Sequence, residues 1–122
     1  MRRLLVLAFL ALTGQSALAD PYVTCDNGLR CIMAPCPSLN ARNLATGETE
    51  RIAKVDLSRL SLAERRQIAR NDATYHGLVV LDGDVRSHRV SSANRAAATV
   101  LVVKHLERRS TWWERRQCRS GR

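Results

Sequence analysis

The stretch CIMAPC, residues 31–36, holds two cysteines whose type and spacing could support redox chemistry, metal binding or a disulfide. A structural zinc site needs four ligands within about 2.0 to 2.3 Å of one ion. Cys118 has no cysteine near it in the chain, and the three histidines are scattered. A thioredoxin-like site has two residues between its cysteines, whereas here there are four, and Pro35 disfavours the helix that would activate a thiol. We therefore predict a disulfide that staples a loop, and neither a metal site nor a cofactor.

The N-terminus predicts an oxidising compartment for these cysteines. Residues 1–3 are basic at Arg2 and Arg3, residues 4–12 are almost entirely apolar, and the small residues Ala17 and Ala19 fit a cleavage site. This pattern is typical of a secretory signal peptide cleaved after Ala19. The apolar run is shorter than the roughly 20 residues that span a bilayer. We expect a periplasmic or secreted mature chain that carries no transmembrane segment.

All four cysteines follow the predicted cleavage site, and an even number in a small exported domain predicts two disulfides. Four cysteines allow three connectivities, and the sequence does not exclude any of them. The favoured pairing is Cys31 with Cys36 and Cys25 with Cys118. A mature chain of this length supports one modest core, so we expect a single domain.

The C-terminal stretch LERRSTWWERRQCRSGR combines arginines with two adjacent tryptophans. Guanidinium groups bind phosphate in a bidentate manner, and indole rings stack on bases or lie at a lipid headgroup interface. This chemistry suits a polyanion or an anionic membrane surface. The formal net charge of +9, or +7 without Arg2 and Arg3, does not carry this interpretation by itself, because the codon bias of a GC-rich genome also produces an excess of arginine. The alternative is a tail with one tryptophan packed on the sheet and solvated arginines. The candidate binding residues are Arg108, Arg109, Trp112, Trp113, Arg115, Arg116 and Arg119.

Catalytic motifs are absent from the sequence. It has no Gly-rich phosphate loop, no Gly-x-Ser-x-Gly elbow and no His-Glu-x-x-His helix. Asp82 and Asp84 flank Gly83 without the ligand spacing of a calcium loop, and His88 follows them closely. Proximity in sequence does not make a catalytic triad, which is defined by geometry. We expect no catalytic residues and a protein that is not an enzyme.

The first half of the mature chain predicts two strands and a helix. Extended segments at residues 39–42 and 52–57 flank turn residues at 45–48. A Ser-x-x-Glu capping box at Ser61 starts a run of good helix formers, which Asn71 can end in a left-handed conformation.

The second half predicts further strands. Residues 78–81 are apolar, and Asp82-Gly83 marks either a hairpin turn or a bulge in one long strand that reaches Val90. The apolar run 98–103 fits a strand buried on both faces, because its β-branched residues disfavour a buried helix. The order strand, strand, helix, strand, strand indicates an α+β fold with a small, mostly antiparallel, curved sheet or partly open barrel.

Four segments in this order, CIMAPCPSLNARNL, IAKVDLSRLSL, GLVVLDGDV and VLVVKHLERRSTWW, resemble a family of uncharacterised secreted bacterial domains. The resemblance covers residues 31–112. Members often carry a further cysteine pair between the first two strands, whereas this chain has Cys25 and Cys118. The resemblance implies an exported domain and no particular activity.

The predicted organisation is a signal peptide (1–19), a Cys-rich N-terminal loop (20–37), an α+β domain (38–107) and a basic tail (108–122). We expect a non-catalytic binding or interaction module of the cell envelope, whose partner is an envelope protein or an anionic polymer or lipid. The alternative is a polyanion or membrane-surface binder that uses the tail, and an enzyme comes third.

Overall fold

The computed structural model of the protein describes residues 19–89 and 97–121. The predicted signal peptide, apart from Ala19, lies outside this part of the chain. The strands are β1 (Asp20–Asp26), β2 (Leu39–Asn43), β3 (Thr49–Ile52), β4 (Lys54–Asp56), β5 (Val79–Arg89) and β6 (Ala97–Arg109). The helices are α1 (Leu62–Ala69), α2 (Ala73–His76) and α3 (Trp112–Ser120).

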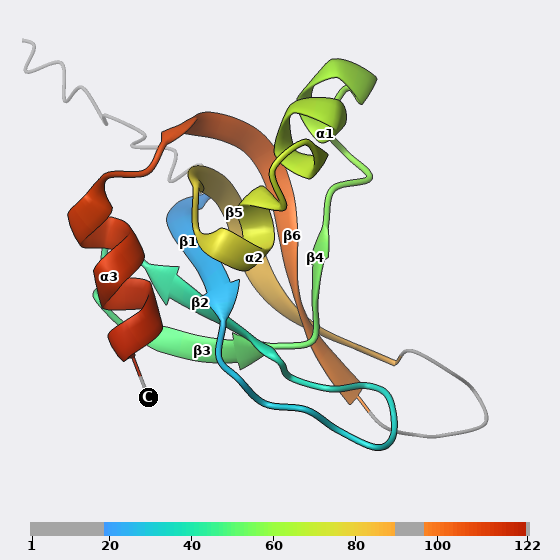
Figure 1. Ribbon diagram of the computed structural model, residues 1–122. Coiled ribbons are helices and arrows are strands. Elements are labelled where there is room, and N and C mark those ends of the chain that lie inside the picture. Colours follow the sequence, from blue (N-terminus) through green and yellow to red (C-terminus); the bar gives the residue numbers. More distant parts are fainter. Residues whose placement is uncertain (1–18, 90–96, 122) are drawn as a thin grey trace, which may run out of the picture.

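The six strands form one open, mixed sheet in the order β3-β2-β1-β5-β6-β4 (Figure 1). Every pairing is antiparallel except that of β4 with β6. The edge strands β3 and β4 follow one another in the chain through Ala53, whose N–H donates to the Thr99 carbonyl at 2.8 Å. The sheet must therefore curl until its edges approach each other, although it does not close. The predicted curved α+β sheet is confirmed, but the strand expected at 52–57 divides at Ala53, because the chain crosses there to the other edge.

β5 is a single long strand whose register against β6 shifts between Val80 and Leu81 and again between Asp82 and Gly83. Each shift is a bulge whose extra residue lies in β6. The predicted long strand with an irregularity at Gly83 is therefore confirmed, and the hairpin is wrong. A Cβ atom at position 83 would collide with the carbonyl oxygen of Val102. Glycine is required there because the two backbones approach more closely than any side chain permits.

β6 confirms the predicted strand at 98–103 and extends it to Arg109. Val100 and Val102 are buried on one face, and Leu101 and Val103 on the other. A strand covered on both faces has a continuous apolar run in its sequence. Because β6 is long, Arg108 and Arg109 of the predicted tail belong to the sheet.

The Ser61 capping box forms as predicted: the Glu64 N–H donates to the Ser61 hydroxyl at 3.2 Å, and the Glu64 carboxylate accepts from the Ser61 N–H at 3.3 Å. The helix ends at Ala69 with Arg70 as its C-cap, so Asn71 follows it as predicted. The left-handed residue is Asp72 (φ 48°) and not Asn71, because the chain turns there into α2.

β1 lies in the middle of the sheet. It occupies the first part of residues 20–37, which were predicted to form an N-terminal loop, so that prediction is wrong for this part of the chain. Tyr22 belongs to the core cluster under α1 and α2, whereas Val23 and Cys25 pack with Cys118 of α3. The Thr24 hydroxyl donates to the Thr74 carbonyl in α2 at 2.7 Å. The alternating side chains of β1 therefore join α2 on one face to α3 on the other, and Figure 1 shows the two helices on either side of the strand.

Candidate functional site

The predicted C-terminal tail folds as helix α3, and its start is set by a second capping box. The Glu114 N–H donates to the Thr111 hydroxyl at 3.2 Å, and the Thr111 N–H donates to the Glu114 carboxylate at 2.8 Å. Each bond satisfies a backbone N–H that lies outside the regular helical pattern. Sequence reasoning missed this helix, although Thr-x-x-Glu is the same signal that marks α1.

The C-terminal half of α3 is fixed to the sheet. Cys118 is fully buried and bonded to Cys25 of β1. The buried Asn40 amide on β2 donates to the carbonyl oxygens of Cys118, at 3.2 Å, and of Gly121, at 2.7 Å. These bonds satisfy carbonyls that the helix end leaves open. The helix is thus held by a covalent bond and by a polar side chain of another strand.

Two of the seven candidate residues hold the start of α3 in place. Arg108 donates two hydrogen bonds to the Glu114 carboxylate, at 2.8 and 2.9 Å. The Arg108 guanidinium is the main reason why the pKa of Glu114 falls from 4.5 to about 2. Arg115 donates to the Ser110 carbonyl at 2.9 Å, and the Ser110 hydroxyl donates in turn to the Gly77 carbonyl. Arg108 and Arg115 therefore connect the helix to β6 and to the end of α2.

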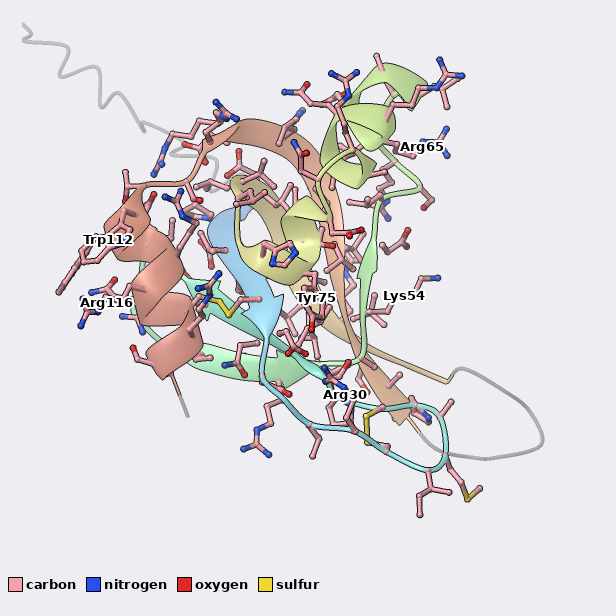
Figure 2. All side chains as sticks on the ribbon, in the orientation of Figure 1. Arg30, Lys54, Arg65, Tyr75, Trp112 and Arg116 are labelled. Atoms are coloured by element: carbon pink, nitrogen blue, oxygen red, sulfur yellow. A yellow bond between two sulfur atoms is a disulfide. The ribbon has the colours of Figure 1, made fainter. Side chains whose placement is uncertain are left out.

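Four other candidate residues lie together on the solvent side of the helix, which we call the outer face of α3: Trp112, Trp113, Arg116 and Arg119. Trp112 is 60% exposed and Trp113 is 57% exposed, so neither indole is buried against the sheet. The Arg116 guanidinium carbon lies 5.2 Å from the Trp112 ring centroid, within cation–π range. Figure 2 shows Trp112 and Arg116 directed away from the body of the protein.

The seventh candidate, Arg109, is separate from the outer face. It pairs in register with Val79 at the end of β6, and its exposed side chain lines a cleft that also contains Leu78 and Arg115. The five arginines of the predicted cluster thus fall into three groups. Two arginines hold the helix in place, two lie on its outer face, and one lies apart from that face beside a cleft.

The stapled loop does not contribute to this face. Cys31 is bonded to Cys36, and the base of the loop is held by the Asn27 amide, which donates to the Pro37 carbonyl at 2.8 Å. Ile32 and Met33 are exposed at its tip. All four cysteines are therefore paired, which indicates folding in an oxidising, extracellular type of environment.

The carboxylates of the Asp-Gly-Asp stretch have separate partners. Asp84 pairs with Lys104 at 2.9 Å, and that ammonium lowers the pKa of Asp84. A hydrogen bond with Asp82 raises the pKa of Glu107. The side chain of His88 lies outside the described residues. Within residues 19–89 and 97–121, no three metal-binding side chains gather, and no helix is long and apolar enough to cross a membrane.

A family model described as a domain of unknown function (DUF6748) matches residues 2–106. The matched segment contains β1 to β5 and most of β6, and it ends before α3. The resemblance to an uncharacterised domain family is thereby confirmed. No curated protein matches the chain, and no solved structure matches it.

Proposed function

Because the chain belongs to the DUF6748 family, whose description names no activity, we propose its function from the geometry of α3. We propose a non-catalytic binding module of the cell envelope that holds a phosphate-bearing anionic polymer on the outer face of α3. The observation that carries this proposal is the exposure of Trp112 and Trp113 beside Arg116, on a helix that a disulfide fixes to the sheet.

The side chains of the outer face suit such a partner. Tryptophan and arginine are the residues that most often dominate binding energy at interfaces. An indole offers a flat surface for stacking, and a guanidinium grips phosphate oxygens in a bidentate manner. The one acidic residue of α3, Glu114, forms an ion pair with Arg108. Its negative charge is therefore compensated there and does not neutralise the positive charge of Arg116.

The rigidity of α3 also supports binding. Ordering of a flexible segment costs free energy upon association, and a preorganised surface avoids that cost. Cys118, the Asn40 amide and the Arg108–Glu114 pair hold α3 before any partner arrives. A tail that served only for solubility would not require three attachments of different kinds.

Titration with long-chain polyphosphate, followed by tryptophan fluorescence, tests the proposal directly. The chain contains two tryptophans, and both lie on the outer face, so their emission reports on this face alone. We expect R116Q/R119Q to weaken binding and to reduce the slope of log affinity against log salt by about two. The matched control is R65Q/R66Q, which removes the same charge from exposed positions in α1.

Equal losses in both double variants would show that binding follows net charge and would overturn the proposed site. An emission change that occurs with phosphatidylglycerol vesicles but not with polyphosphate would replace the polymer with a membrane surface. Unchanged emission with both probes would remove the binding role of α3.

A further inference from the structure

A cleft opens where the end of α1, the start of α2 and the end of β6 meet. It consists of two adjoining hollows of about 330 Å³ and about 420 Å³, which share Leu78 and Arg109. Small-molecule sites typically occupy roughly 300 to 1,000 Å³. We call this feature the junction cleft, and the residues that matter for its chemistry are Arg70, Leu78, Val79, Arg109 and Arg115.

Positive charge dominates the junction cleft. Arg70 comes from the end of α1, Arg109 from β6 and Arg115 from α3, and no carboxylate among residues 19–89 and 97–121 lines either hollow. Among the described residues, neither Arg70 nor Arg109 forms an ion pair. Like charges that converge without a counter-ion repel one another, and a bound anion relieves this repulsion. Arg115 donates to the Ser110 carbonyl and hydroxyl through one terminal nitrogen, and a guanidinium has five N–H donors, so further donors of Arg115 are available to a ligand.

Three apolar residues, Ala73, Leu78 and Val79, form part of the lining, and we call them the apolar floor of the junction cleft. Val79 and Ala73 are buried, and Leu78 is half-buried between the two hollows. A site that combines an apolar floor with a few convergent polar groups is suited to an organic ligand. An inorganic anion would use the arginines and leave the floor in water.

The backbone around the cleft is fixed. Asp72, just before α2, holds a left-handed conformation that non-glycine residues rarely adopt. The Leu78 N–H donates to the Ala73 carbonyl at 3.0 Å, and the Leu78 carbonyl accepts from the Ser110 N–H at 3.0 Å.

We propose that the junction cleft binds a small organic dianion. Its phosphate or paired carboxylates lie between Arg70 and Arg109, and its apolar body rests on Leu78 and Val79. This inference goes beyond the polymer-binding face, because none of the four outer-face side chains lines the cleft. It assigns a second, independent ligand to the same domain.

Isothermal titration calorimetry on the full mature chain tests the inference with three probes: phenyl phosphate, phthalate and inorganic phosphate. We expect at least one of the organic dianions to bind several-fold more tightly than inorganic phosphate, because only they cover the apolar floor. Whichever of the two binds identifies the acid group. R70Q/R109Q should weaken binding by about tenfold or more, since charge-assisted bonds to two guanidinium groups are lost.

Two comparisons make the outcome specific. R65Q/R66Q removes equal charge from the exposed part of α1 and should leave the affinity within about twofold, whereas an equal loss would overturn the site. R116Q/R119Q should weaken polyphosphate binding only, so either proposal can fail while the other stands. Absence of heat with both organic dianions, or equal affinity for inorganic phosphate, would overturn the proposed ligand class.

Discussion

Cys25 and Cys118 are 93 positions apart in the chain, yet their Cα atoms lie 6.2 Å apart and their sulfur atoms are bonded. The bond joins the central strand β1 to the last turn of α3. Both sulfurs are buried beside Val23 and Val80. A single covalent link therefore places the outer face of α3 on a defined side of the sheet.

Removal of this bond should cost far more stability than removal of the other disulfide. Cross-linking lowers the entropy of the unfolded chain by an amount that grows with loop length. We expect C25A/C118A to lose about 4 to 5 kcal/mol of unfolding free energy, and C31A/C36A about 2 kcal/mol. Urea unfolding of the oxidised proteins measures both losses. Equal losses would mean that the unfolded chain is already restrained near β1 and α3.

Acid should weaken the attachment of α3 through Glu114. Its folded pKa of about 2 lies below its ordinary value of 4.5. The stability it contributes is therefore complete above about pH 4.5 and is lost as the pH falls towards 2. We expect the free energy of unfolding to fall by about 2 kcal/mol. This figure is already discounted for solvent screening, because Arg108 is partly exposed. Unfolding of E114Q should vary less with pH over this window, and an unchanged pH profile would contradict the role of Glu114.

The two tryptophans should contribute little to stability. Since both are more than half exposed, W112A and W113A should each change the unfolding free energy by less than about 1 kcal/mol. Acrylamide should quench the fluorescence of the native protein nearly as well as that of the unfolded chain. A blue-shifted, protected emission would show that an indole packs on the sheet, as the alternative interpretation of the tail held.

Gly83 should not tolerate a side chain. G83A forces a Cβ atom against the Val102 carbonyl, and we expect a loss of about 2 to 4 kcal/mol. Gly28 is the matched control, because it has a positive φ of 80° and a Cβ atom added there would meet no other atom within 4 Å. G28A should therefore cost only about 1 kcal/mol, from backbone conformation alone. Similar thermal unfolding midpoints for the two variants would contradict the close approach at the bulge.

The parts of the fold that the sequence predicted depend on local physics. A capping box at Ser61 needs only four residues, and the bulge at Asp82-Gly83 needs a glycine at one position. The apolar run of β6 reflects burial on both faces, which a strand shows in its own composition. The missed helix α3 carried a local signal too, at Thr111, but its density of arginine favoured an interpretation as a charged tail.

The pairing of strands that are distant in the sequence could not be predicted from such local patterns. β1 is short and buried on both faces, so it shows no alternation of polar and apolar residues. The parallel pairing of β4 with β6 depends on the curl of the whole sheet. The roles of the candidate residues could not be predicted locally either. The seven residues lie in one stretch of sequence, but neighbours that are distant in the sequence decide which of them hold the helix, which face solvent and which line a cleft.

The sequence by itself determined the composition of the site, the even number of cysteines and the local starts of helix and bulge, because these follow from residue types a few positions apart. Only the tertiary structure decided that Arg108 and Arg115 hold α3 while Arg116 faces solvent beside Trp112. It also decided that Arg70 and Arg109, from distant parts of the chain, line the same hollow as Leu78. The physical reason is that the role of a guanidinium depends on which carboxylate, carbonyl or solvent lies within a few ångströms, and long-range packing sets those neighbours.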